Sequence, residues 1–167
     1  ISVQSEKNNK VREEGQSLRH KILDTIKKHQ LHSAGDKLLI AVSGGADSLS
    51  LLHVLYNLQG ELGVSLHIAH IHHGLRRESD QEAVLMKKYA LKLGVPITVC
   101  RVDVNRYKRK YGGSTQEAAR NLRYAALSAI AQRVGATRIA TAHHRDDRVE
   151  TLLMRVLAGS GIDGLAA

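Results

Sequence analysis

Hydrophobic residues recur along the chain in two alternating spacings, one typical of strands and one typical of helices. Four short apolar runs occupy residues 38–42, 65–71, 97–102 and 138–142. Each of the first three precedes a longer stretch with apolar residues at helical spacing, at about 47–59, 79–93 and 115–134. Strands that alternate with helices predict right-handed crossovers and a parallel sheet with helices on both faces. The pattern therefore predicts a three-layer, Rossmann-like α/β fold.

The two ends of this pattern and one internal stretch are less regular. Residues 1–16 are polar with little apolar periodicity, and we expect a flexible leader ahead of one domain that spans 17–167. An amphipathic helix is predicted from Leu18, and a last helix from about 145–146. The basic stretch 105–114 interrupts the alternation and is predicted to be an exposed loop or a short irregular helix.

Composition and charge narrow the class of protein. Lys and Arg outnumber Asp and Glu by 25 to 16, which favours a polyanionic partner such as nucleic acid or a nucleotide phosphate. A basic surface without such a partner is the alternative. The lone Cys100 excludes a disulfide framework and a cysteine-rich zinc site. No apolar run reaches the roughly 18 residues that span a bilayer, and no signal peptide opens the chain, so we expect a cytoplasmic protein without a membrane partner.

Polar clusters follow all four predicted strands at their carboxyl ends. They are "SGGADS" at 43–48, "HIHHGLRRESD" at 70–80, "NRYKRKYGGS" at 105–114 and "AHHRDD" at 142–147. Ligands of open parallel sheets bind beyond the carboxyl ends of the strands, where the strand order reverses. The four clusters therefore predict one shared site.

The first cluster has the chemistry of an anion cradle. Gly44 and Gly45 allow a tight turn whose N–H groups face an anion, and the following helix adds the positive end of its dipole. Ser43 and Ser48 supply hydroxyl groups. Asp47 would repel a phosphate unless a cation lies between them, which suggests Mg²⁺. The Lys of a Walker A loop and the GxGxxG spacing are both missing, and a plain strand-to-helix turn remains an alternative.

The fourth cluster and a nearby helix supply further candidates. His143, Asp147 and Glu150 could bind a metal, hold an ammonium group or pass protons, and Asp147 and Glu150 share a helical face if a helix begins near 145. Capping of that helix is the ordinary role of one such acid. Arg123 could clamp a phosphate from the helix 115–134, although a solvated helix face is the alternative.

Taken together, these clusters resemble the catalytic domain of the tRNA(Ile)-lysidine synthetase family, within the PP-loop ATP pyrophosphatases. The signature SGGxDS, shared by many PP-loop enzymes, is matched at 43–48. The narrower resemblance lies in "AHIHHGLR", "EAARNLRY", "TAHHRDDRVET" and "GSGIDGL", at 69–76, 117–124, 141–151 and 159–165. One departure is Arg148, which stands where the family usually has Gln.

The resemblance implies an ATP-dependent ligase that modifies tRNA. Such an enzyme adenylates the C2 position of the wobble cytidine in an isoleucine tRNA with a CAU anticodon, and then joins free L-lysine to form lysidine. It implies a PP-loop fold of the adenine nucleotide α hydrolase type, and a chain that lacks the tRNA-binding parts which follow the catalytic domain in the family. It implies nothing about the oligomeric state.

The resemblance also assigns roles residue by residue. It implies that the PP-loop binds the pyrophosphate of ATP through Ser43, Gly44, Gly45 and Ser48, with Arg123 on an ATP phosphate and Asp47 as catalytic ligand of Mg²⁺. His143 and Asp147 would serve the activation step, and Asp147 with Glu150 would bind lysine. The alternatives are another PP-loop adenylating enzyme such as a tRNA thiolase, and a nucleotide-binding module without catalysis.

Overall fold

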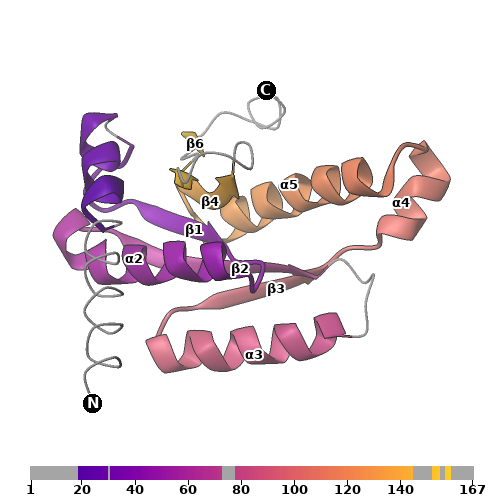
Figure 1. The fold of residues 1–167 in the computed structure, drawn as a ribbon, viewed down its shortest axis with the longest axis horizontal. Coiled ribbons are helices and arrows are strands. Elements are labelled where there is room, and N and C mark those ends of the chain that lie inside the picture. The colour runs from indigo at the N-terminus through magenta and orange to yellow at the C-terminus, as the bar shows by residue number, and fades with distance from the viewer. Residues whose placement is uncertain (1–18, 30, 73–77, 145–151, 155–156, 159–167) are drawn as a thin grey trace, which may run out of the picture.

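The computed structural model describes residues 19–29, 31–72, 78–144, 152–154 and 157–158. It confirms the predicted three-layer α/β fold (Figure 1). The helix that precedes the sheet covers 19–28 in the described residues. The first half of the chain then forms β1 (Lys37–Ala41), α2 (Ala46–Leu62), β2 (Ser65–His72), α3 (Glu78–Leu93) and β3 (Ile97–Arg101). The second half forms α4 (Val104–Tyr111), α5 (Thr115–Val134), β4 (Arg138–His144), β5 (Leu152–Met154) and β6 (Leu157–Ala158).

The sheet is built outward from β1 in two directions. Its strand order is β3-β2-β1-β4-β5, with β1 to β4 mutually parallel and β5 and β6 antiparallel to β4. Leu39 of β1 is aligned with His67 of β2 on one side and with Ile139 of β4 on the other. The chain leaves β1 toward β2 and β3 and returns on the opposite side at β4, so the strand order reverses between β1 and β4. A crevice is expected there, at the carboxyl ends of both strands.

Alternate residues of β1 enter two separate cores. Leu38 and Ile40 pack on one face against the helix 19–28, α2 and α3, while Leu39 packs on the other face against Leu127 and Ile130 of α5. All three β1 residues are buried, because both faces of the strand are covered. Figure 1 shows the two helical layers on either side of the sheet. This double burial explains why the strand reads as an unbroken apolar run in the sequence.

The basic stretch 105–114 contains the short helix that was one of its two predicted forms. Its helix, α4, begins after Asp103, whose carboxylate accepts a hydrogen bond from the backbone N–H of Arg106 at 2.9 Å. Val104 is buried and anchors the helix. α5 follows at once, with the Ser114 hydroxyl accepting from the N–H of Glu117 at 3.1 Å. Figure 1 places α4 beyond the carboxyl end of β3.

The end of the chain differs from the predicted pattern. The start of the predicted last helix, at 145–146, lies outside the described residues, but the helix does not extend into Leu152–Met154, which is strand β5. β5 pairs with β4, His143 being aligned with Leu153. An apolar tripeptide that pairs with the open edge of a strand satisfies backbone groups that the edge would otherwise expose. The helical spacing of the acids did not reveal this alternative.

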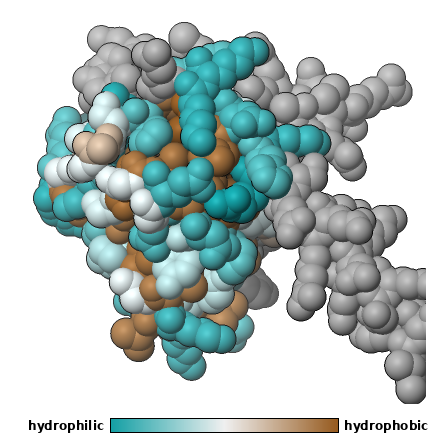
Figure 2. Space-filling model, turned by 90° about the vertical axis from the view of Figure 1, so that its left-hand side faces the viewer, coloured by the Kyte–Doolittle hydropathy of each residue, from teal (hydrophilic) through white to brown (hydrophobic). Residues whose placement is uncertain are grey.

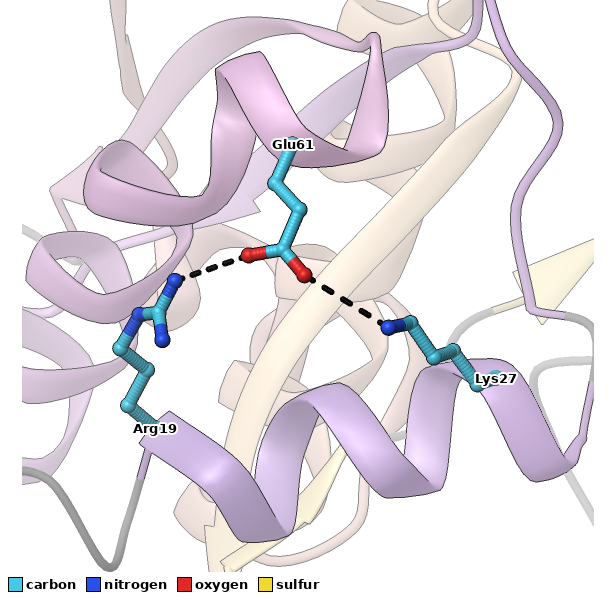
Figure 3. Close-up of polar contacts among 3 residues, drawn as sticks. All are labelled: Arg19, Lys27 and Glu61. Atoms are coloured by element: carbon cyan, nitrogen blue, oxygen red, sulfur yellow. Dashed lines mark hydrogen bonds and ion pairs between the residues drawn. The ribbon is translucent and has the colours of Figure 1, made fainter.

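Surface ion pairs join the first helix to α2. One oxygen of Glu61 accepts from Arg19 at 2.8 Å, and the other lies 3.5 Å from Lys27 (Figure 3). These side chains are largely exposed, so each pair contributes only about 0–1 kcal/mol. The helix 19–28 is held over α2 mainly by Ile22, Leu23 and Ile26, which are buried in the larger core.

The surface at the amino ends of the strands contains both hydrophobic and hydrophilic residues. Figure 2 views this surface, where hydrophobic residues show between hydrophilic ones, and some reach solvent at its lower end. Leu91, near the end of α3, has 83% of its surface exposed. No helix in the described part of the chain is long and apolar enough to cross a membrane.

Candidate active site

A pocket of about 150 Å³ opens at the carboxyl ends of β1, β2 and β4, beside the point where the strand order reverses. Residues from the three strands, from the loop after β1 and from three helices line it: Ala41, Val42, Ser43, Ser48, Ala69, His70, Ile71, His72, Glu82, Arg123, Thr141 and Ala142. The pocket therefore brings together parts of the first and second predicted clusters and the predicted arginine. It lies where the fold is expected to bind a ligand.

The loop between β1 and α2 depends on one glycine for its shape. Gly44 has a φ of +92°, a conformation that side-chain-bearing residues rarely adopt, and it therefore requires glycine. Gly45 has an ordinary φ of −72°, and a Cβ there would meet only the Ser43 hydroxyl at 3.5 Å. The sequence suggested that both glycines make the turn, whereas only Gly44 is required by backbone conformation.

Ser48 closes the loop by binding its two ends. Its hydroxyl oxygen accepts from the backbone N–H of Ser43 at 3.2 Å, and the hydroxyl donates to the carbonyl of Gly45 at 2.9 Å. The single proton of Ser48 is thereby used within the loop. The Ser43 hydroxyl lies 3.2 Å from Ser48 Oγ and accepts from the N–H of Gly45 at 3.3 Å. Ser48 is thus an organiser of the loop, and Ser43 holds the proton that can turn toward a ligand.

The amino end of α2 faces the same loop. Its N-cap residue, Gly45, carries no side chain that could cap the first turn. Helix N-termini present unpaired N–H groups and the positive end of the dipole, which together bind anions. Asp47 lies in this first turn with its side chain exposed. The structure thus keeps Asp47 beside the predicted cradle, although it is not among the residues that line the pocket.

Arg123 reaches the pocket from the opposite helical layer. Its Nε atom is buried and has no hydrogen-bond partner among the described residues. Its guanidinium carbon lies 5.5 Å from the centre of the Tyr124 ring, while that of Arg120 lies 5.2 Å from the same ring. A buried guanidinium N–H without a partner is costly unless an anion or water occupies the pocket. Arg123 is therefore placed to bind an anion, and Arg120 is exposed.

Two histidines of β2 form part of the pocket wall. His70 is buried, and its Nδ1 lies 2.8 Å from the carbonyl oxygen of Val42. Because a carbonyl only accepts, this hydrogen bond requires the proton on Nδ1. His72 is 4% exposed, and its Nε2 lies 2.9 Å from a carboxylate oxygen of Asp80 on α3. The hydrogen bond fixes the ring of His72 against the pocket.

The fourth predicted cluster is only partly covered by the structure. His143 lies in β4, but its side chain is not described. Asp147 and Glu150 lie outside the described residues. Their convergence on the pocket stays a prediction. Thr141, two residues before His143, is buried and lines the pocket, so β4 does lead to the site.

Two polar lining residues, Thr141 and Glu82, lie outside the four predicted clusters, and His70 belongs to the second cluster but was not assigned a role. His70 and Thr141 occupy apolar runs, where a single polar residue between buried neighbours is the available signal. Glu82 follows the β2 cluster by two residues on α3, and nothing in its spacing distinguishes it from a solvated helix position. His72, in the same predicted cluster as His70, lines the pocket, whereas His73 lies outside the described residues.

The side chains near the loop decide which kind of metal site is possible. In the described ranges, no group of three or more His, Cys, Asp or Glu side chains could hold a metal ion. Mg²⁺ in nucleotide sites commonly takes only one or two protein carboxylates, the rest of its ligands being phosphate oxygens and water. The exposed Asp47 carboxylate beside the anion cradle fits a magnesium ion that arrives with a nucleotide, and does not fit a permanent metal site.

Comparison with known proteins identifies the family of this chain. A family model described as a PP-loop domain matches residues 14–167. A tRNA(Ile)-lysidine synthase of Dehalococcoides mccartyi is 42% identical over 149 residues, which cover 89% of this chain and 32% of the relative. One of Petrotoga mobilis is 38% identical over 150 residues, which cover 90% of this chain and 48% of that relative. The chain thus spans between a third and a half of these relatives.

Two solved structures share the fold at low sequence identity. The U34-tRNA thiolase NcsA from Methanococcus maripaludis, solved with its [4Fe-4S] cluster, matches with a TM-score of 0.65 and 15% identity, covering 77% of this chain and 45% of that one. The NH3-dependent NAD synthetase from Campylobacter jejuni matches with a TM-score of 0.54 and 13% identity, covering 75% and 55%. With the signature loop, the fold and the family match in agreement, the chain belongs to the PP-loop family.

Proposed function

We propose that this chain is the ATP-binding catalytic part of a cytoplasmic tRNA(Ile)-lysidine synthase. The observation that carries the proposal is the pocket that joins the SGGADS loop to Arg123 at the switch point of the sheet. Similarity to tRNA(Ile)-lysidine synthases along most of the chain supports the choice of reaction. The substrates would be ATP, an isoleucine tRNA with a CAU anticodon and free L-lysine.

The first step would be an adenylation. The O2 atom of the wobble cytidine attacks the α-phosphorus of ATP, a new O–P bond forms, and the bond to the departing pyrophosphate breaks. Negative charge grows on the pyrophosphate as it leaves. N–H groups at the start of α2 and the Arg123 guanidinium would stabilise this charge, in place of the lysine that other phosphate-binding loops carry.

A magnesium ion bound with ATP would neutralise further phosphate charge. Asp47 is the residue that would hold it, since its exposed carboxylate lies in the first turn of α2 beside the loop. Without a cation, the same carboxylate would oppose the approach of a triphosphate. Asp47 therefore couples ATP binding to the presence of a divalent ion.

The second step would form lysidine. The ε-amine of lysine attacks C2 of the adenylated cytidine, and the C2–O2 bond breaks with release of AMP. The amine reacts only after it loses a proton, so its site needs groups that attract the ammonium ion and then accept a proton. Asp147 and Glu150 would bind lysine in this way, with Asp147 and His143 also serving activation of the cytidine. The contact of β4 with the pocket through Thr141 supports this location.

One experiment tests the reaction. The full-length protein is incubated with ATP, Mg²⁺, isotopically labelled lysine and a transcript of the isoleucine tRNA with a CAU anticodon. Label in the tRNA, together with equimolar AMP and pyrophosphate, is expected. Release of AMP and pyrophosphate without lysine incorporation would instead indicate another adenylating enzyme of this fold, such as a tRNA thiolase. Nucleotide binding without any release would indicate a binding module.

A further inference from the structure

The helix α4 carries an unusual density of positive charge. Residues 101–111 contain five Lys or Arg and a single acid, Asp103. The Asp103 carboxylate is bound to the first turn of α4 through the N–H of Arg106. The proposed roles of the pocket use none of these cations.

Three of the cations lie on one face of α4. At about 100° per residue, Arg106, Arg109 and Lys110 fall within an arc of roughly 100°. All three are exposed, whereas Val104, on the opposite side, is 1% exposed. Val104 is therefore used in packing, and the side of the helix that faces away from it is cationic. We name Arg106, Arg109 and Lys110 the α4 cation face.

The α4 cation face is not neutralised within the described part of the chain. The ion pairs found there involve Arg19, Lys27 and His72, and none involves the α4 cation face. Lys110 Nζ lies 4.9 Å from the centre of the Tyr111 ring. Tyr111 is 63% exposed and its ring centre lies 4.8 Å from that of Tyr107. Cations beside an exposed aromatic ring can bind phosphates and stack on a base.

The α4 cation face lies on the same edge of the molecule as the pocket. Lys108 donates a hydrogen bond to the Thr115 hydroxyl at 2.7 Å, which fixes the last turn of α4 at the first residue of α5. Arg123, in the pocket, follows Thr115 by eight residues on α5, an axial distance of about 12 Å. A stacked nucleic acid strand that rises about 3.4 Å per nucleotide covers the distance from Thr115 to Arg123 in three to four steps. Figure 1 shows α4 and α5 joined at this end of the sheet.

We propose that the α4 cation face binds the RNA backbone that flanks the nucleotide reacting in the pocket. The inference rests on the proposed function in one respect, since it takes the substrate to be an RNA. Charge complementarity supplies the occupant, because a row of exposed cations a few nucleotides from a phosphate site matches a continuing phosphate chain. A membrane is disfavoured, since Val104 is buried in the fold and only the Tyr111 ring of this side of α4 is exposed enough to enter a bilayer.

The test compares two triple variants of the full-length protein. Arg106→Gln, Arg109→Gln and Lys110→Gln together remove the α4 cation face. The control, Lys87→Gln, Lys88→Gln and Lys92→Gln, removes the same charge from exposed positions on α3. Binding of the isoleucine tRNA transcript is measured by fluorescence anisotropy from 50 to 300 mM KCl. ATP binding and thermal unfolding of each variant are measured alongside.

The expected result is specific to α4. For the α4 variant, the affinity for the RNA at low salt should fall at least tenfold. The slope of log K against log salt should decrease in magnitude by about 2. The control should retain both values, and both variants should bind ATP as the unmodified protein does. Restoring charge with Arg106→Lys, Arg109→Lys and Lys110→Arg should restore binding. Equal slopes for the α4 variant and the control would overturn the proposal.

Three further outcomes separate this proposal from others. If the α4 variant binds RNA normally but loses binding to vesicles of phosphatidylserine and phosphatidylcholine, the partner is a membrane and the proposal is wrong. If RNA binding depends on α4 while the unmodified protein makes no lysidine, the RNA surface is supported and the proposed reaction fails. If the unmodified protein forms lysidine and the α4 variant binds RNA as the unmodified protein does, the proposed reaction is supported and the proposed RNA surface is wrong.

Discussion

The hydroxyl oxygens of Ser43 and Ser48 lie 3.2 Å apart, at the two ends of the loop that is expected to hold the pyrophosphate. Ser48 accepts from the backbone of Ser43 and donates to the carbonyl of Gly45, so one buried side chain fixes both limbs of the loop. The loop is thereby organised before any ligand arrives. Preorganised N–H groups stabilise a leaving anion without the cost of reorientation.

Ser48→Ala tests this organising role. The substitution removes the acceptor of the Ser43 N–H and one of the two donors to the Gly45 carbonyl, which keeps the N–H of Leu49, and should lower the free energy of unfolding by about 1–2 kcal/mol. We expect the ATP concentration for half-maximal pyrophosphate release to rise at least tenfold. Ser50→Ala, two residues further along α2 on an exposed position, should change neither quantity measurably. Equal behaviour of the two variants in urea unfolding and ATP titration would contradict the role.

Much of the fold could be predicted because the central strands are buried on both faces. Runs such as Leu38–Val42 are then continuously apolar, and the helices between them show helical spacing. The strands β5 and β6 escaped prediction, because they are two or three residues long and depend on pairing with β4 rather than on their own pattern. Pairing across a sheet edge leaves no periodicity in the sequence.

The sequence predicted which residue types form the candidate site and at which strand ends they lie. Ser43, Ser48 and Arg123 were proposed from their chemistry, and all three line the pocket. Their separate roles could not be predicted, because they depend on two structural details. The Ser48 proton is already donated to the Gly45 carbonyl, and the Nε of Arg123 is buried. His70 lies in the predicted cluster 70–80, but its role in the wall could not be predicted, since it follows from a hydrogen bond to Val42.

Arg123 and Arg120 form a matched pair for mutation. Both guanidinium groups lie near the same Tyr124 ring, but only Arg123 lines the pocket. Arg123→Lys keeps the charge and removes the planar group with its buried Nε, so the Kd for ATP should rise about tenfold or more. Arg120→Lys should leave ATP binding within about twofold. Isothermal titration with ATP and Mg²⁺ checks both, and a similar loss in the two variants would refute the assignment.

Substitutions of Asp47 and of Glu150 should impair different steps of the reaction. Asp47→Asn removes the proposed magnesium ligand, and should abolish most pyrophosphate release at 1 mM Mg²⁺, with partial recovery as Mg²⁺ is raised. Glu150→Gln should leave pyrophosphate release largely intact and raise the lysine concentration needed for half-maximal lysidine formation. Titrations of each variant with Mg²⁺ and with lysine separate the two roles. An unchanged lysine dependence in Glu150→Gln would remove that residue from the lysine site.

Leu127 tests the smaller of the two cores. It is fully buried on α5, where that helix packs against Leu39 on the face of the sheet that carries Arg123. Leu127→Ala should lower the free energy of unfolding by about 2–5 kcal/mol. Leu91→Ala removes the same atoms from a side chain that is 83% exposed, and should cost less than about 0.5 kcal/mol. Chemical denaturation of both variants measures the difference.

Asp36 predicts a pH dependence of stability at the amino edge of the sheet. Its carboxylate accepts from the backbone N–H of Ser33 and from the hydroxyl of Thr137, both at 2.7 Å, and so connects the start of β1 to the residue before β4. The Ser33 N–H, followed by the Thr137 hydroxyl, holds the pKa of Asp36 below its ordinary value of 3.8. Both bonds favour the charged form.

The sign of the effect follows from the lowered pKa. In the unfolded chain Asp36 takes up a proton near pH 3.8, whereas in the folded protein it does so only at lower pH. Its contribution to stability is therefore complete above that pH and is lost as the pH falls through the lowered pKa. Asp36→Asn should lower the free energy of unfolding at pH 7 by about 1 kcal/mol, a modest value because the carboxylate is close to solvent. The difference between variant and unmodified protein should shrink from pH 5 to pH 2.5 in urea unfolding. Asp24→Asn, on the exposed side of the helix 19–28, serves as the control, and a difference for Asp36→Asn that does not vary with pH would contradict the assigned cause.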